Sequence, residues 1–200
     1  NYLLQINAIK LNTKNPFIWA SGIKSPIYCD NRLILSDTEV RGYIANQMSN
    51  IITKSFSDNY ILAGVATGAI AIGALIAEKL KKPYIYVRPN PKGHGLKNQI
   101  EGSLPIGSNV VVIEDLISTG MSSLNAVNAI KSADSNVKGM LSIFSYSFDF
   151  AIERFKSKNI DLISLADYNI LIEIVKEEKI INEDEIKKLE RWRENPENWM

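Results

Sequence analysis

The hydrophobic and polar positions along the chain form two kinds of block, and their order predicts strands that are followed by helices. Buried strands are predicted at five short apolar runs, 60–64, 83–87, 110–113, 137–145 and 160–165. Such runs, rich in β-branched and aromatic residues, are typical of strands in a parallel sheet that is covered on both faces. Between them, apolar residues recur at helical spacing, as Val40, Ile44 and Met48 do. This alternation predicts an α/β fold, doubly wound, with a mostly parallel sheet flanked by helices.

The two ends of the chain have a different pattern. Residues 2–11 have the apolar spacing of a short helix, and residues 17–20 and 27–30 predict two short strands joined by a turn. Taken alone, these strands form a surface hairpin with a basic tip at Lys24. Near the other end, Asp167 and Asn182 are predicted to cap two helices.

Composition and charge describe an ordinary globular chain. Its 200 residues are 46% hydrophobic and 22% charged, which fits a single domain over residues 1–200. The net charge of +1 gives no basic footprint for nucleic acid or for an anionic membrane. No apolar run approaches the ~18 residues of a membrane span, and no signal peptide is visible. The single cysteine, Cys29, excludes an internal disulfide, and we expect a cytoplasmic protein.

The segment from Val110 to Ser123, VVVIEDLISTGMSS, predicts a strand, a turn and the start of a helix. The turn falls at the carboxyl end of the strand, where open α/β sheets bind ligands. Gly120 permits a positive φ, and the backbone N–H groups of the turn lead into a helix N-terminus, which favours a phosphate. The adjacent carboxylates of Glu114 and Asp115 would repel phosphate and instead suit sugar hydroxyls or a hydrated Mg²⁺. The pattern indicates a ribose 5-phosphate, although an ordinary turn with two solvated acids has the same outline.

Two further stretches bear on the site. Thr67 and Gly68 lie in a second small-residue turn between a strand and a helix, which predicts a pyrophosphate site or, equally, a tight helix–strand crossing. Residues 88–102 form a long loop rich in glycine and proline, with Arg88, Lys92 and the single histidine, His94. Polar, glycine-rich loops of this length in compact domains are usually functional lids or disordered, and in a lid these cations would neutralise a departing pyrophosphate.

The central segment resembles the phosphoribosyl pyrophosphate (PRPP) signature of type I phosphoribosyltransferases. In both, four apolar residues precede two acids, two further apolar residues and a short loop that contains Thr-Gly. Met121 stands where a second glycine is frequent. The resemblance implies that PRPP is bound by Glu114, Asp115, Leu116, Ile117, Ser118, Thr119, Gly120, Met121 and Ser122.

Two other segments resemble orotate phosphoribosyltransferases in particular. The segment PFIWASGIKSPIYCDNR is similar to the part of that family that forms a hood over the base. The resemblance implies orotate binding by Ser118, Tyr28, Cys29 and Lys24, with Ala20 and Tyr146 at positions where some members have lysine and arginine. The loop spacing matches the family's catalytic loop, which implies catalytic and PRPP-binding roles for Arg88, Lys92 and His94.

Membership of this family implies the transfer of a phosphoribosyl group from PRPP to orotate. It also implies Mg²⁺ held mainly by the substrate near Glu114 and Asp115, and a homodimer whose lid loops are shared across subunits. The expected hood comprises about residues 17–35 and the C-terminal region, over a core of about residues 36–165. Two alternatives share the signature: a purine or uracil phosphoribosyltransferase, and a regulatory module that senses PRPP. The first lacks the hood segment and the second needs no cationic lid, so both features favour the orotate enzyme.

Overall fold

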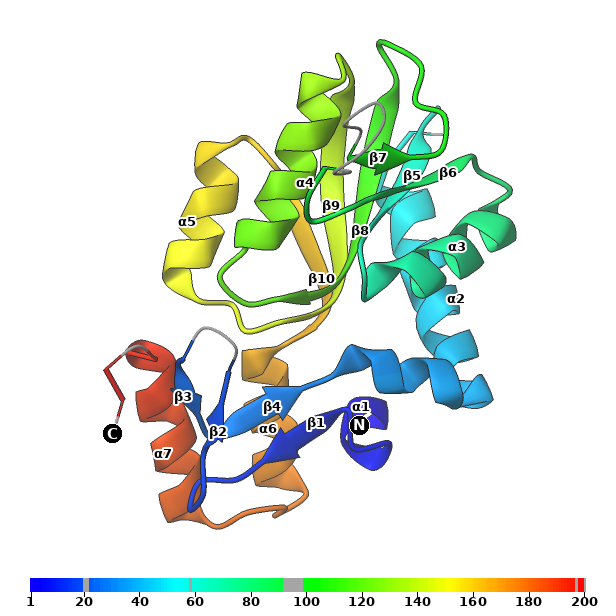
Figure 1. The fold of residues 1–200 in the computed structure, drawn as a ribbon. Helices are drawn as coiled ribbons and strands as arrows, with labels where there is room; N and C mark the ends of the chain where they lie inside the picture. Colours follow the sequence, from blue (N-terminus) through cyan, green and yellow to red (C-terminus); the bar gives the residue numbers. More distant parts are fainter. Residues whose placement is uncertain (20–21, 58, 92–98, 197, 200) are drawn as a thin grey trace.

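The structure is a computed structural model, and it describes residues 1–19, 22–57, 59–91, 99–196 and 198–199. Its centre is a six-stranded sheet (Figure 1). The strands lie side by side in the order β10 (Leu162–Asp167), β9 (Asn136–Ser145), β8 (Asn109–Ile117), β5 (Ile61–Val65), β6 (Tyr84–Val87) and β7 (Ile100–Glu101). All neighbouring pairs are parallel except the pair of β6 and β7 at the edge. The predicted doubly wound, mostly parallel sheet is confirmed.

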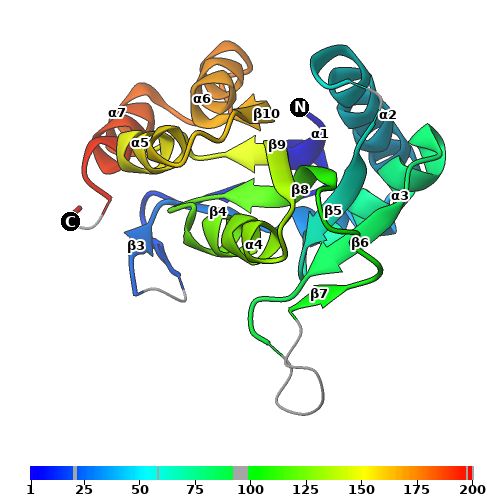
Figure 2. The same ribbon diagram turned by 90° about the horizontal axis from the view of Figure 1, so that it is seen from above.

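Helices cover both faces of this sheet (Figure 2). One face packs against α2 (Thr38–Ser55) and α3 (Ala69–Leu80), and the other against α4 (Met121–Ser132) and α5 (Asp149–Ser157). Successive residues of β8 alternate between the two, because side chains along a strand point to opposite faces. Val111 and Ile113 join the cluster under α2 and α3, whereas Val110 and Val112 join the cluster under α4 and α5. This burial on both sides explains why the run is continuously apolar.

Both ends of the chain form a second layer, which we call the hood. It consists of α1 (Tyr2–Gln5), β1 (Ile9–Leu11), β2 (Phe17–Ile18), β3 (Lys24–Ser25), β4 (Ile27–Cys29), α6 (Tyr168–Glu177) and α7 (Glu183–Glu194). The hood shares a hydrophobic cluster with the carboxyl end of β9, where Phe144 and Tyr146 are buried. The 3₁₀-helix η1 (Asn31–Ser36) leads from the hood into α2 (Figure 1). The hood therefore lies at the ligand-binding end of the sheet.

The predicted helix over residues 2–11 is wrong in its second half. The helix ends at Gln5, and Ile9–Leu11 is a strand. Asn7, which lies between them, has a φ of 56°, and a residue in this left-handed region interrupts a helix.

The predicted pairing of residues 17–20 with residues 27–30 is also wrong. Strand β2 pairs with β3, and β4 pairs with β1 instead. The turn closes early because Gly22, with a φ of 85°, donates its N–H to the carbonyl of Trp19 (2.8 Å). The hydroxyl of Ser25 then bonds to the backbone of Ile27, which directs the chain away from β3.

The central strand is longer than predicted, and β7 and α5 are among the elements that were not predicted. Strand β8 continues through the acids to Ile117, so Glu114 and Asp115 are strand residues that point to opposite faces. The edge strand β7 has only two residues, too few for a periodic pattern. Helix α5 begins after Phe148, shortly beyond the end of β9, and its buried residues, Ala151 and Phe155, are too few to define a stripe.

Candidate active site

A polar pocket of about 430 Å³ lies where the carboxyl ends of β5 and β8 meet the hood. Eight of the predicted site residues are in its lining: Cys29, Thr67, Gly68, Glu114, Asp115, Leu116, Ser118 and Ser122. They come from three segments that are far apart in the sequence. The volume lies within the range of about 300–1,000 Å³ that is typical of small-molecule sites.

The turn after β8 leaves the backbone donors of α4 available. Gly120 has a φ of 76° and precedes α4 without a side-chain capping bond. A Cβ at Gly120 would lie 2.8 Å from Cε2 of Phe155, so packing as well as conformation requires glycine here. Ser118 and Ser122 line the pocket beside this turn. The turn therefore offers the unpaired N–H groups and the positive dipole end that bind a phosphate.

Other residues of the signature lie outside the pocket lining and hold the turn in place. Ile117 is buried, and its carbonyl accepts a hydrogen bond from the N–H of Tyr146 (2.9 Å). The carbonyl of Thr119 accepts one from Nη1 of Arg154 (2.9 Å). Met121, at the position where a second glycine is frequent, is 54% exposed, so its larger side chain meets no crowding.

The turn after β5 approaches the signature strand closely. A Cβ at Gly68 would lie 2.1 Å from Oδ2 of Asp115, so this position has no room for a side chain while the carboxylate keeps its present orientation. Gly68 is the N-cap residue of α3 and, like Gly120, provides no side-chain capping bond, and the Ala66–Thr67 peptide bond is cis. The predicted tight crossing exists as well, but it involves Gly64, which packs against Tyr84. The structure thus shows the predicted tight crossing, and the pyrophosphate site at Thr67 and Gly68 stays a prediction.

The two acids of the signature have different environments. Glu114 is only 3% exposed, and its carboxylate accepts hydrogen bonds from the hydroxyl of Ser123 (2.7 Å) and from the N–H of Asp115 (3.0 Å). Burial raises the pKa of Glu114 well above its usual value, and the neighbouring charge of Asp115 raises it further. Asp115 is only partly buried. Asp115 is therefore the more accessible carboxylate of the pair.

The raised pKa of Glu114 predicts a pH dependence of stability. At a pH between 4.5, the usual value, and the raised pKa, the folded protein keeps a proton that the unfolded chain releases. The free energy of unfolding should therefore fall as pH rises through this window, by up to ~1.4 kcal/mol per pH unit. Glu114→Gln should remove this component, because the amide does not titrate.

Urea unfolding of the wild type and of Glu114→Gln, from about pH 5 to about pH 8, measures the effect. The curve of the wild type should fall more steeply with pH than that of the variant. Parallel curves would show that Glu114 titrates normally in the folded protein.

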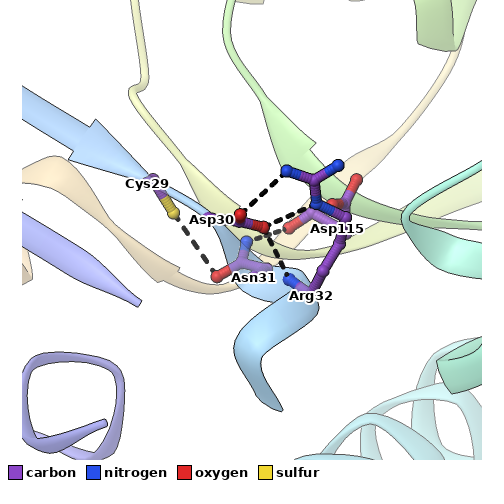
Figure 3. A network of polar contacts seen from close by, with 5 residues as sticks. All are labelled: Cys29, Asp30, Asn31, Arg32 and Asp115. Atoms are coloured by element: carbon purple, nitrogen blue, oxygen red, sulfur yellow. Dashed lines mark hydrogen bonds and ion pairs between the residues drawn. The ribbon is translucent and has the colours of Figure 1, made fainter. Parts of the chain in front are cut away.

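A polar network joins the hood to the signature strand (Figure 3). Asn31, which is 3% exposed, donates from Nδ2 to the backbone carbonyl of Asp115 (2.6 Å) and accepts a hydrogen bond from Sγ of Cys29 (3.4 Å). Asp30 binds the guanidinium of Arg32, at 2.7 Å to Nε and 2.8 Å to Nη2. Our sequence reasoning missed Asp30, Asn31 and Arg32. Their signal was three polar residues directly after a short apolar strand, in a segment that already carried the family resemblance.

The residues predicted for the base are not all brought to the pocket. Cys29 lines it, and burial raises the pKa of its thiol well above the usual range. Tyr28 is 37% exposed, and its ring packs against that of Phe17. The side chain of Lys24 is exposed and is not part of the pocket lining. Tyr146 is buried within the hood cluster.

The stem of the predicted lid is an antiparallel pair of strand ends. The N–H of Arg88 donates to the carbonyl of Gln99 (2.8 Å), and Nε2 of Gln99 donates back to the carbonyl of Arg88 (2.8 Å). The guanidinium of Arg88 lies 3.4 Å from Oε1 of Glu101. Lys92 and His94 lie outside the described residues.

The described residues contain no group of three or more histidine, cysteine or acidic side chains that would hold a metal ion by themselves. The pocket does provide carboxylate oxygens, which Mg²⁺ prefers. The donor set fits an ion that a substrate brings with it. A second hollow, of about 410 Å³, lies between α1, α2 and α6, and its lining is almost wholly apolar, which does not suit a phosphate ligand. None of the helices in the described parts of the chain has the length and apolar character needed to span a bilayer.

Comparisons with known proteins agree with one another, although no family model matches the chain. The orotate phosphoribosyltransferase of Phocaeicola vulgatus is 49% identical over 197 residues, which cover 98% of this chain and 93% of the relative. The orotate phosphoribosyltransferase of Bacillus pumilus is 48% identical over 201 residues, which cover 100% of this chain and 95% of the relative.

Among solved structures, orotate phosphoribosyltransferase from Aeropyrum pernix matches with a TM-score of 0.77 and 28% identity, over 90% of this chain and 98% of that one. Adenine phosphoribosyltransferase from Leishmania tarentolae matches with a TM-score of 0.60 and 22% identity, over 72% of this chain and 78% of that one. This second likeness shows a shared fold only. The fold is that of the type I phosphoribosyltransferases, and the pocket lies at the carboxyl end of the central sheet of this chain. Within this class, the chain belongs to the orotate phosphoribosyltransferase family.

Proposed function

We propose that the chain transfers the 5-phosphoribosyl group from PRPP to orotate, giving orotidine 5′-monophosphate (OMP) and pyrophosphate in de novo pyrimidine synthesis. One observation carries the proposal: the N-termini of α3 and α4, which have no side-chain cap, border a single pocket whose lining also includes Asp115. This arrangement matches a ribose with a phosphate at one end and a diphosphate at the other.

The residues of the pocket give each part of PRPP a partner. The turn from Ser118 to Ser122 binds the 5′-phosphate, and Thr67 and Gly68 bind the pyrophosphate. Glu114 and Asp115 hold the ribose hydroxyls. Displacement at the anomeric carbon passes through a state with positive charge on the sugar, and the carboxylate of Asp115 stabilises this charge because the pocket fixes it in place beforehand.

The base lies on the hood side of the pocket. Ser118 faces it from the signature turn, and Cys29 contacts its ring from β4, while Tyr28 lies beside Cys29 in the same strand with its side chain outside the pocket lining. Asn31 keeps this strand at a fixed distance from the ribose site, because its amide bonds to the backbone of Asp115. The base nitrogen and the anomeric carbon are thereby held in a geometry suited to reaction.

The lid completes the site. Arg88, Lys92 and His94 close over the diphosphate, neutralise it as it departs and exclude the water that would hydrolyse PRPP. Glu114 and Asp115 would lie beside a Mg²⁺ ion that is held mainly by substrate oxygens, and this ion would supply positive charge next to the diphosphate. The protein works in the cytoplasm as a homodimer in which each lid reaches the neighbouring subunit's site, so sedimentation of the active protein should give a dimer and not a monomer.

The test is the loss of orotate absorbance in the presence of PRPP and Mg²⁺, run beside uracil, hypoxanthine and adenine. Turnover of orotate alone is the expected result. Turnover of another base in preference to orotate would assign the chain to a different phosphoribosyltransferase. Binding of PRPP without turnover of any base would contradict an enzymatic role and favour a regulatory one.

A further inference from the structure

Arg32 is the one basic residue in the pocket lining, as far as the structure describes it. It lies in η1, three residues beyond Cys29 of the strand that flanks the proposed base site. Its side chain is 62% exposed, so a ligand in the pocket has access to the guanidinium.

Asp30 holds the guanidinium of Arg32 in place through the edge formed by Nε and Nη2. Nε and Nη2 of Arg32 donate to the two carboxylate oxygens of Asp30, at 2.7 and 2.8 Å. Oδ1 of Asp30 also accepts the backbone N–H of Arg32 (3.2 Å), so the acid is itself fixed by the turn. No described residue accepts a hydrogen bond from Nη1 of Arg32. An arginine that is clamped in this way presents its remaining donors at a fixed position, which suits a planar anion such as a carboxylate.

The position of Arg32 matches the chemistry of orotate. Orotate differs from uracil by a carboxylate on the ring carbon next to the nitrogen that bonds to the sugar. In the pocket, this carboxylate must lie between the strand that flanks the base and the acids that hold the ribose. Arg32 belongs to the segment that follows this strand, and the charge of Asp115 is close enough to stabilise the charge of the guanidinium. The phosphates of PRPP are instead met by the N-termini of α3 and α4.

The other residues that could be expected to contact the carboxylate of orotate lie away from the base side of the pocket. The side chain of Lys24 is outside the pocket lining, and Tyr146, at a position where some family members have arginine, is buried in the hood. Arg88 lies at the lid stem beside Glu101. Arg32 is thus the cation that the described structure places at the base side of the pocket.

We propose that Arg32 determines the specificity for orotate by binding its carboxylate, and that Asp30 is the positioning residue that aims the guanidinium. This inference rests on the proposed function, since it names the residue that recognises the base of that same reaction.

The test compares two nucleotides that differ only in this carboxylate: OMP, which has it, and UMP, which lacks it. Calorimetric titration of Arg32→Ala should show OMP binding about 10- to 100-fold more weakly than to the wild type, with UMP affinity changed by less than about twofold. Arg32→Gln, which keeps most of the side-chain volume without the charge, should give the same pattern. In kinetics, kcat/KM for orotate should fall, while the KM for PRPP should not rise.

Lys10→Ala is the matched control, because it removes one positive charge from the exposed face of β1 beside Asp30 without touching the pocket lining. It should leave both affinities unchanged. Asp30→Asn should weaken OMP binding less than Arg32→Ala does, because the guanidinium remains but loses its clamp.

The outcomes separate the inference from the proposed function. An equal loss of OMP and UMP affinity in Arg32→Ala would overturn the inference, because Arg32 would then act on the shared phosphoribosyl group. Unchanged affinity for both would also overturn it. A wild type that neither prefers OMP to UMP nor turns over orotate would instead refute the proposed function.

Discussion

Gly68→Ala is expected to lower kcat/KM for PRPP by about 100-fold while changing the free energy of unfolding little. Gly68 has a φ of −61° and a ψ of −37°, which alanine adopts without strain. Its new Cβ, however, would lie 2.1 Å from Oδ2 and 2.3 Å from Cγ of Asp115. The carboxylate is the end of a side chain and can rotate away, so the fold survives. The rotation removes the carboxylate from the ribose site, and a displacement of this size is enough to abolish most of the activity.

Gly42→Ala is the matched control for Gly68→Ala. Gly42 lies within α2, and a Cβ there would meet nothing within 4 Å. We expect it to leave kcat/KM unchanged and to stabilise the protein by roughly 0.5–1 kcal/mol, because glycine is unfavourable inside a helix. Steady-state kinetics and urea unfolding measure both variants. Wild-type activity of Gly68→Ala would show that Asp115 does not need its present position.

Trp192→Ala should destabilise the protein by about 3–5 kcal/mol, the range found when a large buried aromatic side chain is truncated. Trp192 is fully buried, and its ring centroid lies 5.5–5.8 Å from those of Trp19, Tyr146, Phe148 and Tyr168. No single neighbour can fill the space that the indole leaves.

The indole also makes a polar contact, since its Nε1 donates to the carbonyl of Lys24 in β3 (3.0 Å). Trp192→Phe separates the two contributions, because it keeps most of the ring packing and loses this hydrogen bond. We expect it to cost about 1–3 kcal/mol. Urea unfolding followed by far-ultraviolet circular dichroism gives both values. A loss of less than about 1 kcal/mol in Trp192→Ala would mean that α7 contributes little to the stability of the hood.

The central sheet was predictable because its strands are buried on both faces and are therefore continuous apolar runs. Periodicity within a strand also explains the two-sided core, in which Val111 and Val112 belong to different clusters. The hood was predicted poorly, since its strands have only two or three residues and their pairing depends on single turns. The φ of 56° at Asn7 and the turn at Gly22 are local backbone conformations, which a pattern of hydrophobic positions does not predict.

The sequence indicated which residues belong to the candidate site, but not how their side chains are oriented or which of them lie close together. Two neighbouring acids look equivalent in the sequence. Because β8 continues through them, Glu114 turns inward to Ser123 while Asp115 faces Gly68. Arg32 was missed for a related reason. Its proposed role depends on its position in a pocket whose other wall, at Glu114 and Asp115, is distant in the sequence, and the local pattern around Asp30 does not show this proximity.

Cys29 makes the junction of hood and core observable. It is the single cysteine of the chain, it is buried, and its thiol bonds to Asn31, which holds the signature strand. Because burial raises the pKa of the thiol, little reactive thiolate forms while the junction is closed. The rate at which a thiol reagent labels the native protein therefore reports how often this junction opens. Ligands that bind across the junction should slow the labelling in proportion to their occupancy.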